Sequence, residues 1–220
     1  STGLAHPAPV RPNAPSGRGP ALLRDRSRGH LARLSIVLAA VLLALPACSQ
    51  PVDLSHQAPA TLGEEPVGYE MAKVTRVVDG DTIEVTITSR VEGAGAGRAQ
   101  VGQSYDVRLL GIDTPESVKP DSPVECFGPE ASEAAAALLQ DRAVRLVDDV
   151  EEVDGYGRLL RYVYVEEELA NARLVANGYA RVLIYEPNVR HSAFLLDLED
   201  RARAAERGLW ATDTCGRGGS

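Results

Sequence analysis

The stretch AKVTRVVDGDTIEVTIT (residues 72–88) carries the clearest fold signal in the chain. Residues 72–78 are rich in β-branched side chains, and residues 82–88 alternate apolar with polar side chains, as half-buried strands do. Between them, Asp79-Gly80-Asp81 is a turn signal, because Asp-Gly pairs accept the positive φ of tight turns. The stretch therefore predicts a β-hairpin.

Beyond the hairpin, predicted strands alternate with predicted helices. Three more strands are expected, at residues 104–112, 143–148 and 159–165. Three helices are expected, at residues 128–140, 168–177 and 192–206. Pro129 at the first position of one helix and Gly178 after another support these boundaries. Five strands and three helices fit an α+β, mainly β fold, a five-stranded OB-type Greek-key barrel, although other small α+β folds share the pattern.

The first 47 residues have the order of a leader and signal peptide. Arginines come first, an uncharged apolar run follows at residues 34–47, and small residues end it. The run is shorter than the ~20 apolar residues that span a membrane. It also lacks the polar stripe of a helix packed on a core, so the sequence predicts export.

Leu45-Pro46-Ala47-Cys48 resembles a bacterial lipobox, which predicts that Cys48 is lipidated and anchors the protein to the extracytoplasmic face of the cell membrane. Cleavage and secretion without lipid is the alternative. Residues 48–66 are polar and contain prolines, so we expect a lipid-attached flexible tether. Residues 67–220 then form the folded domain.

Cysteine number favours one disulfide. The chain has three cysteines, and lipidation of Cys48 leaves Cys126 and Cys215 as an even pair in a compartment that permits disulfides. Two free thiols are the alternative. Neither cysteine has a second Cys or His nearby at zinc-ligand spacing.

The charge of the chain is acidic. Its formal net charge is −8, but residues 1–47 hold six of the 23 basic and one of the 31 acidic residues. The remaining 17 basic and 30 acidic residues give −13. This charge argues against a broad basic surface for nucleic acid, so we expect any contact with a polyanion to be local, through a few arginines and a cation.

Several short motifs follow one another in a recognisable order. They are VDGDT (78–82), RLLGIDTPE (108–116), ECFGPEAS (125–132), DGYGRLL (154–160), NARLVANGYARV (171–182) and RGLW (207–210). Together, over about residues 72–210, they resemble the thermonuclease (staphylococcal-nuclease-like) family. The resemblance implies a nuclease-like OB-fold domain that hydrolyses phosphodiester bonds in DNA and RNA by in-line attack of water.

The resemblance also implies a calcium site. Asp81 and Asp113 match the family's calcium carboxylates, and Thr114 matches the residue that adds a backbone carbonyl. Carboxylate and carbonyl oxygens with bound waters suit a hard ion such as Ca²⁺.

Catalytic and substrate-binding roles come from the same resemblance. Arg108 and Arg158 match two arginines that grip phosphate, for which the guanidinium fork is suited. Glu116 matches the carboxylate that orients or deprotonates the attacking water. Tyr156 and Tyr185 are expected to bind substrate. We therefore expect a monomeric, calcium-dependent endonuclease outside the cytoplasm, with a non-catalytic OB-fold binding module of the cell envelope as the alternative.

Overall fold

The structure, a computed structural model, describes residues 51–58, 65–117, 124–212 and 214–215. Its strands are β1 (Tyr69–Val77), β2 (Thr82–Val91), β3 (Ser104–Leu109), β4 (Ile112–Asp113), β5 (Ala143–Val147), β6 (Leu159–Val165), β7 (Glu168–Leu169) and β8 (Arg181–Val182). Its helices are α1 (Gly128–Leu139), α2 (Ala170–Ala176), α3 (Ser192–Ala204) and the 3-10 turn η1 (Gly208–Trp210).

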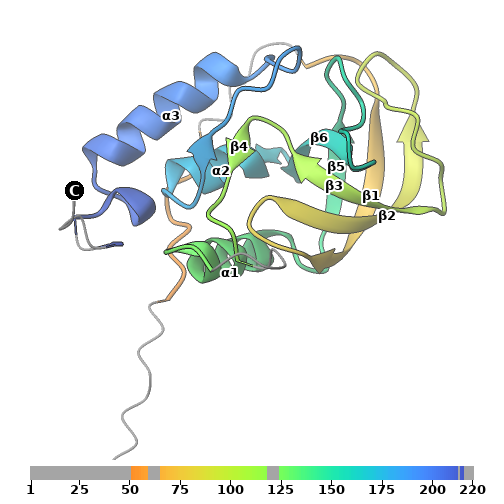
Figure 1. Cartoon of the computed structure of the whole chain (residues 1–220). Coiled ribbons are helices and arrows are strands. Elements are labelled where there is room, and N and C mark those ends of the chain that lie inside the picture. Colours follow the sequence, from red (N-terminus) through yellow and green to blue (C-terminus); the bar gives the residue numbers. More distant parts are fainter. Residues whose placement is uncertain (1–50, 59–64, 118–123, 213, 216–220) are drawn as a thin grey trace, which may run out of the picture. The chain divides into compact units, whose positions relative to one another are not determined.

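Five strands close into a barrel. The sheet order is β3-β2-β1-β5-β6, and β6 pairs back onto β3 in parallel, with Val107 opposite Leu159. Closure leaves the principal strands without a free edge for other chains to pair with. The three helices lie to one side of the barrel (Figure 1), where α1 contacts β1 and α2 contacts β6. The predicted five-stranded OB-type barrel with three helices is confirmed.

The alternation of apolar and polar residues in β2 places the apolar side chains of this strand in the core. Ile83, Val85 and Ile87 of β2 are almost completely buried. Strand β6 differs, because all seven of its residues are buried. It contacts α2 as well as its neighbouring strands, so both of its faces are covered.

Two predicted elements are interrupted in the structure. The strand expected at residues 104–112 ends at Leu109, and the chain turns at Gly111, whose φ is 76°. The positive φ favours glycine here, and a β-carbon at this position would also displace the end of the Leu195 side chain. The turn allows Ile112 and Asp113 to form β4 and pair with β8. The helix expected from residue 168 begins two residues later, because Glu168–Leu169 pairs with β6 as β7.

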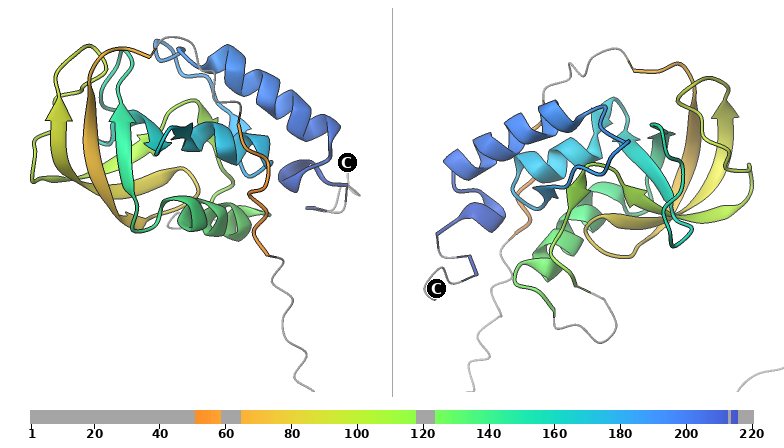
Figure 2. Two further views of the ribbon diagram at one scale, coloured as in Figure 1. Left: turned by 180° about the vertical axis from the view of Figure 1, so that it is seen from behind. Right: turned by 45° about the horizontal axis from the view of Figure 1, so that its top comes forward.

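Residues 51–58 pack on the domain, which differs from the flexible tether predicted over residues 48–66. The Asp53 N–H donates to the Tyr179 hydroxyl at 2.9 Å. The His56 N–H donates to Asn177 Oδ1 at 3.0 Å, and Asn177 Nδ2 donates back to the His56 carbonyl at 2.9 Å. Figure 2 shows this segment running alongside the helical side of the domain. The pattern of residue types could not reveal partners that lie more than 100 positions away.

The predicted signal peptide and the lipidation site at Cys48 lie outside the described residues. None of the helices in the described part of the chain is long and apolar enough to cross a membrane.

Candidate active site

Arg108 joins the two predicted calcium carboxylates. Its Nη2 lies 3.1 Å from Asp81 Oδ2 and 3.0 Å from Asp113 Oδ1. The β-hairpin supplies Asp81 at the start of β2, where Thr82 pairs with Arg108. The turn at Gly111 brings Asp113 back to the same place. The Arg108 side chain is 14% exposed and that of Asp81 8%, so their contact is largely shielded from water, whereas the Asp113 side chain is 49% exposed.

Thr114 donates to the same Asp81 oxygen that Arg108 contacts. Its N–H and its hydroxyl donate to Asp81 Oδ2 at 2.8 and 3.2 Å. A β-carbon on Gly80 would lie 2.7 Å from the Thr114 side chain, so glycine lets the hairpin turn approach this closely. The sequence predicts that this glycine is needed for a positive φ, but the φ of Gly80 lies outside the left-handed region. Close packing against Thr114 explains it instead.

Asp79 is a third carboxylate of the site, to which the sequence assigned only a turn role. Its burial and the neighbouring charge of Asp81 raise the pKa of Asp79 to about 6, and the charge of Glu116 adds to this effect. Burial also raises the pKa of Asp113, against the opposing influence of Arg108. The site therefore concentrates more negative charge than Arg108 balances, and a bound cation would relieve it.

The donor set fits a calcium ion. Asp81 and Asp113 converge on one nitrogen of Arg108, so their oxygens face a common positive charge. Among the residues that the structure describes, no group of three or more His, Cys, Asp or Glu side chains is placed to hold a metal. The carboxylates of Asp81 and Asp113 and the Thr114 carbonyl, which the resemblance implies as ligands, are oxygen donors of the kind that Ca²⁺ prefers, and water would complete its shell.

Glu116 lies two positions after Thr114 in the sequence. Its charge contributes to the raised pKa of Asp79, which places the two acids within electrostatic reach. Its carbonyl accepts the Glu125 N–H at 2.8 Å, and its own N–H donates to Glu125 Oε2 at 3.3 Å. The tertiary structure therefore brings Glu116 to the edge of the site and fixes its backbone.

A pocket of about 580 Å³ adjoins the carboxylates through Arg108. Its lining includes the predicted residues Arg158, Tyr156 and Tyr185, together with an apolar floor of Leu109, Leu110, Ile112, Leu160 and Leu183. Tyr156 is 88% exposed at the pocket rim. One arginine thus belongs to both the carboxylate group and the pocket.

Asp154 holds the second arginine, a contact that the sequence did not reveal. Its Oδ2 accepts Arg158 Nε at 2.6 Å, while its Oδ1 accepts the N–H groups of Tyr156 and Arg158 at 2.9 and 3.0 Å. The Asp154 carboxylate therefore fixes the conformation of the DGYGR motif by these three hydrogen bonds. This arrangement leaves the terminal nitrogens of Arg158 to serve the pocket.

Barrel and site together define a class, OB-type barrels that present arginines and carboxylates around a pocket suited to a phosphate ester. A family model described as staphylococcal nuclease homologue matches residues 106–212. The thermonuclease of Staphylococcus hyicus is 36% identical over 139 residues, 63% of this chain and 75% of that protein. The thermonuclease of Staphylococcus intermedius is 36% identical over 137 residues, 62% of this chain and 74% of that protein.

A relative from a second genus is equally similar. Endonuclease YncB of Bacillus subtilis (strain 168) is 36% identical over 139 residues, 62% of this chain and 59% of that protein. The chain belongs to the staphylococcal nuclease homologue family.

Replacing Asp79 by asparagine is expected to stabilise the metal-free protein above pH 6. The folded-state pKa of Asp79 is about 6 against an ordinary value of 3.8, so its contribution to stability is lost as the pH rises from about 4 through 6. A neutral amide avoids this loss. With allowance for solvent screening of a partly exposed carboxyl, we expect a gain of about 1–2 kcal/mol in the free energy of unfolding.

Thermal unfolding in excess chelator at pH 4.5 and pH 8 checks this prediction. The gain should be complete at pH 8 and clearly smaller at pH 4.5, where the folded-state carboxyl is protonated but the unfolded-state carboxyl is already largely ionised. An equal gain at both values would contradict the assigned pKa.

Proposed function

We propose that this nuclease hydrolyses phosphodiester bonds in both DNA and RNA by in-line attack of water and that it depends on Ca²⁺. The observation that carries the proposal is the contact of Arg108 with Asp81 and Asp113 at the edge of the pocket that Arg158 also lines. It joins a carboxylate group suited to a hard cation to a pocket with two guanidinium groups. The family membership supports the same reaction.

The two arginines bind the phosphate. Arg108 and Arg158 supply charge-assisted donors for the non-bridging oxygens, on which negative charge grows in the transition state. Tyr156 and Tyr185 offer aromatic surface at the pocket rim to the attached nucleoside. The apolar floor excludes water around the phosphate, which strengthens these electrostatic contacts.

Glu116 acts on the attacking water. Its carboxylate accepts a hydrogen bond from the water and orients it, or takes its proton as the new bond to phosphorus forms. When Ca²⁺ is bound, it polarises the phosphoryl group and offsets its charge. Asp81, Asp113 and the Thr114 carbonyl would hold that ion.

We further propose that the protein works as a monomer outside the cytoplasm, anchored to the membrane by lipid on Cys48. The basic-then-apolar order of residues 1–47 supports export. The disulfide between Cys126 and Cys215 is typical of an exported protein. Secretion after cleavage without lipid is the alternative.

One cleavage experiment tests the nuclease proposal. Residues 49–220 are incubated with single-stranded DNA, RNA and duplex DNA, in millimolar calcium and in excess chelator, beside Glu116→Gln. We expect cleavage that the chelator abolishes and that Glu116→Gln lowers by about 10²-fold or more. Glu133→Gln, an exposed change on α1, is the matched control and should cleave like the wild type.

Absence of cleavage by the folded wild type at low salt would refute the nuclease. The non-catalytic binding module would then be favoured, for which the net charge of −13 is the supporting feature.

A further inference from the structure

Glu125 is hydrogen-bonded to the backbone of Glu116. The Glu125 N–H donates to the Glu116 carbonyl at 2.8 Å, and the Glu116 N–H donates to Glu125 Oε2 at 3.3 Å. Both backbone polar groups of Glu116 are therefore engaged by the same partner. The position of Glu116 consequently depends on where the chain holds residues 124–126.

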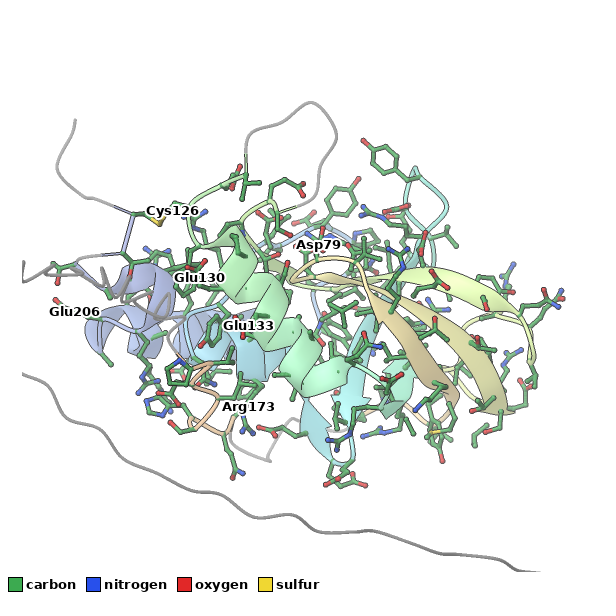
Figure 3. The ribbon with its side chains drawn as sticks, turned by 90° about the horizontal axis from the view of Figure 1, so that it is seen from below. Asp79, Cys126, Glu130, Glu133, Arg173 and Glu206 are labelled. Atoms are coloured by element: carbon green, nitrogen blue, oxygen red, sulfur yellow. A yellow bond between two sulfur atoms is a disulfide. The ribbon has the colours of Figure 1, made fainter. Side chains whose placement is uncertain are left out.

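The start of α1 supports the same segment. A β-carbon on Gly128 would lie 2.5 Å from the Glu116 carbonyl oxygen, so the helix approaches it as closely as glycine allows. The Ser117 and Ser132 hydroxyls are hydrogen-bonded at 2.7 Å. Figure 3 shows Cys126 ahead of the N-terminal end of α1 and Asp79 in the turn after β1. Cys126 thus lies between Glu125 and the helix that Glu116 rests on.

A disulfide ties this segment to the C-terminal end of the chain. Cys126 is bonded to Cys215, with 5.5 Å between their Cα atoms and 89 positions between them in sequence. The chain before Cys215 is itself anchored. Leu209 is buried and its N–H donates to the Gly178 carbonyl at 2.9 Å, while the Arg203 guanidinium lies 4.0 Å from the Trp210 ring. The bridge therefore links the α2–α3 region to the segment that holds Glu116.

We propose that the Cys126–Cys215 disulfide positions Glu116 and makes nuclease turnover depend on the redox state of the bridge. The proposal rests on the role given to Glu116 above. Both cysteines are exposed, so a thiol reductant reaches them.

The redox step balances with a dithiol as the reductant. One thiolate of the dithiol attacks a sulfur of the bridge and forms a mixed disulfide, and its second thiolate displaces the protein sulfur. The protein gains two electrons and two protons and becomes two thiols, while the dithiol becomes its own disulfide. The Glu125–Cys126 segment then keeps only its local contacts.

Amide hydrogen exchange tests the proposal without any reference to activity. The oxidised protein is compared with the protein treated with dithiothreitol, under conditions where both give the same far-ultraviolet circular dichroism, because the disulfide itself contributes to the near-ultraviolet signal. We expect the amides of Glu116 and Glu125 to exchange at least roughly tenfold faster after reduction, with unchanged exchange at Val85 and Val107 in the barrel. Equal protection of Glu116 in the two states would overturn the proposal.

Steady-state kinetics test whether the disulfide affects nuclease turnover. Reduction, or Cys126→Ser with Cys215→Ser, should lower kcat by about tenfold and leave KM within about twofold, as misplacement of one catalytic group does. The double variant should no longer respond to dithiothreitol. In the Glu116→Gln background, reduction should leave the residual rate unchanged, because the bridge acts through Glu116.

A core variant separates positioning from loss of stability. Ile87→Val in β2 lowers stability at a fully buried position away from Glu116, and it should leave kcat unchanged while the protein is folded. A kcat unaffected by reduction, or a loss that is equally large in Glu116→Gln, would refute the positioning role. If the oxidised wild type cleaves nothing, the proposed nuclease function fails, and amide exchange still decides whether the bridge holds Glu116.

Discussion

Replacing Arg108 by alanine lowers nuclease turnover by about 10²–10³-fold, the usual cost of one well-placed donor to a developing charge. The loss is expected in kcat, because the guanidinium serves the phosphate at the transition state. Removing Arg108 also takes away the guanidinium nitrogen that lies 3.1 Å from Asp81 and 3.0 Å from Asp113. Calcium binding should therefore be retained or tightened, since two carboxylates would then face the ion without a competing positive charge.

Turnover and calcium affinity, measured separately, check this result. Arg76→Ala is the matched control, because Arg76 pairs with Glu84 on the barrel surface, outside the pocket. The control should show wild-type kcat. Near-wild-type turnover in folded Arg108→Ala would remove Arg108 from the mechanism, and a loss of calcium binding would place its role in the metal site instead.

Replacing Arg161 by methionine lowers the free energy of unfolding by about 3–5 kcal/mol, the usual cost of removing one partner of a buried ion pair. Arg161 and Glu70 are both fully buried, and Arg161 Nε lies 2.9 Å from Glu70 Oε2. Arg161 Nη1 also donates to Asp148 Oδ1 at 3.2 Å and to two backbone carbonyls. Methionine fills similar space but leaves the Glu70 carboxylate buried without its main counter-charge.

Urea unfolding of three variants checks this prediction. Arg161→Met should show the full loss, and adding Glu70→Gln should recover part of it, because no charge is then left unpaired. Arg76→Met, which breaks an exposed pair, should change stability by no more than about 1 kcal/mol. Similar losses for the exposed and buried arginines would show that burial does not set the energetics of the Arg161 network.

Several features of the site are readable from short stretches of sequence. The turn at Asp79-Gly80-Asp81 and the alternation after it predict the hairpin, because both signals lie within a few residues of each other. The motifs RLLGIDTPE and DGYGRLL supply Arg108 and Arg158, which the structure brings to one pocket. Counting cysteines also indicates the pair that the structure joins as Cys126–Cys215.

Other features depend on partners far apart in the chain. The barrel closes only where β3 meets β6, with Val107 opposite Leu159. Residues 51–58, predicted as tether, dock on side chains more than 100 positions away. Local residue type has no information on such partners, because packing of the whole core selects them.

The sequence by itself determined the family, the hairpin and the types of polar residue that the structure brings to the pocket. Each of these depends on a short contiguous motif. Only the tertiary structure decided that Asp79 is a carboxylate of the site with a raised pKa, because burial and the charge of Asp81 cause that shift. It also decided that Arg161 is a fully buried counter-charge for Glu70. Charge and burial at a residue are properties of its surroundings in space, and those exist only once the barrel has closed.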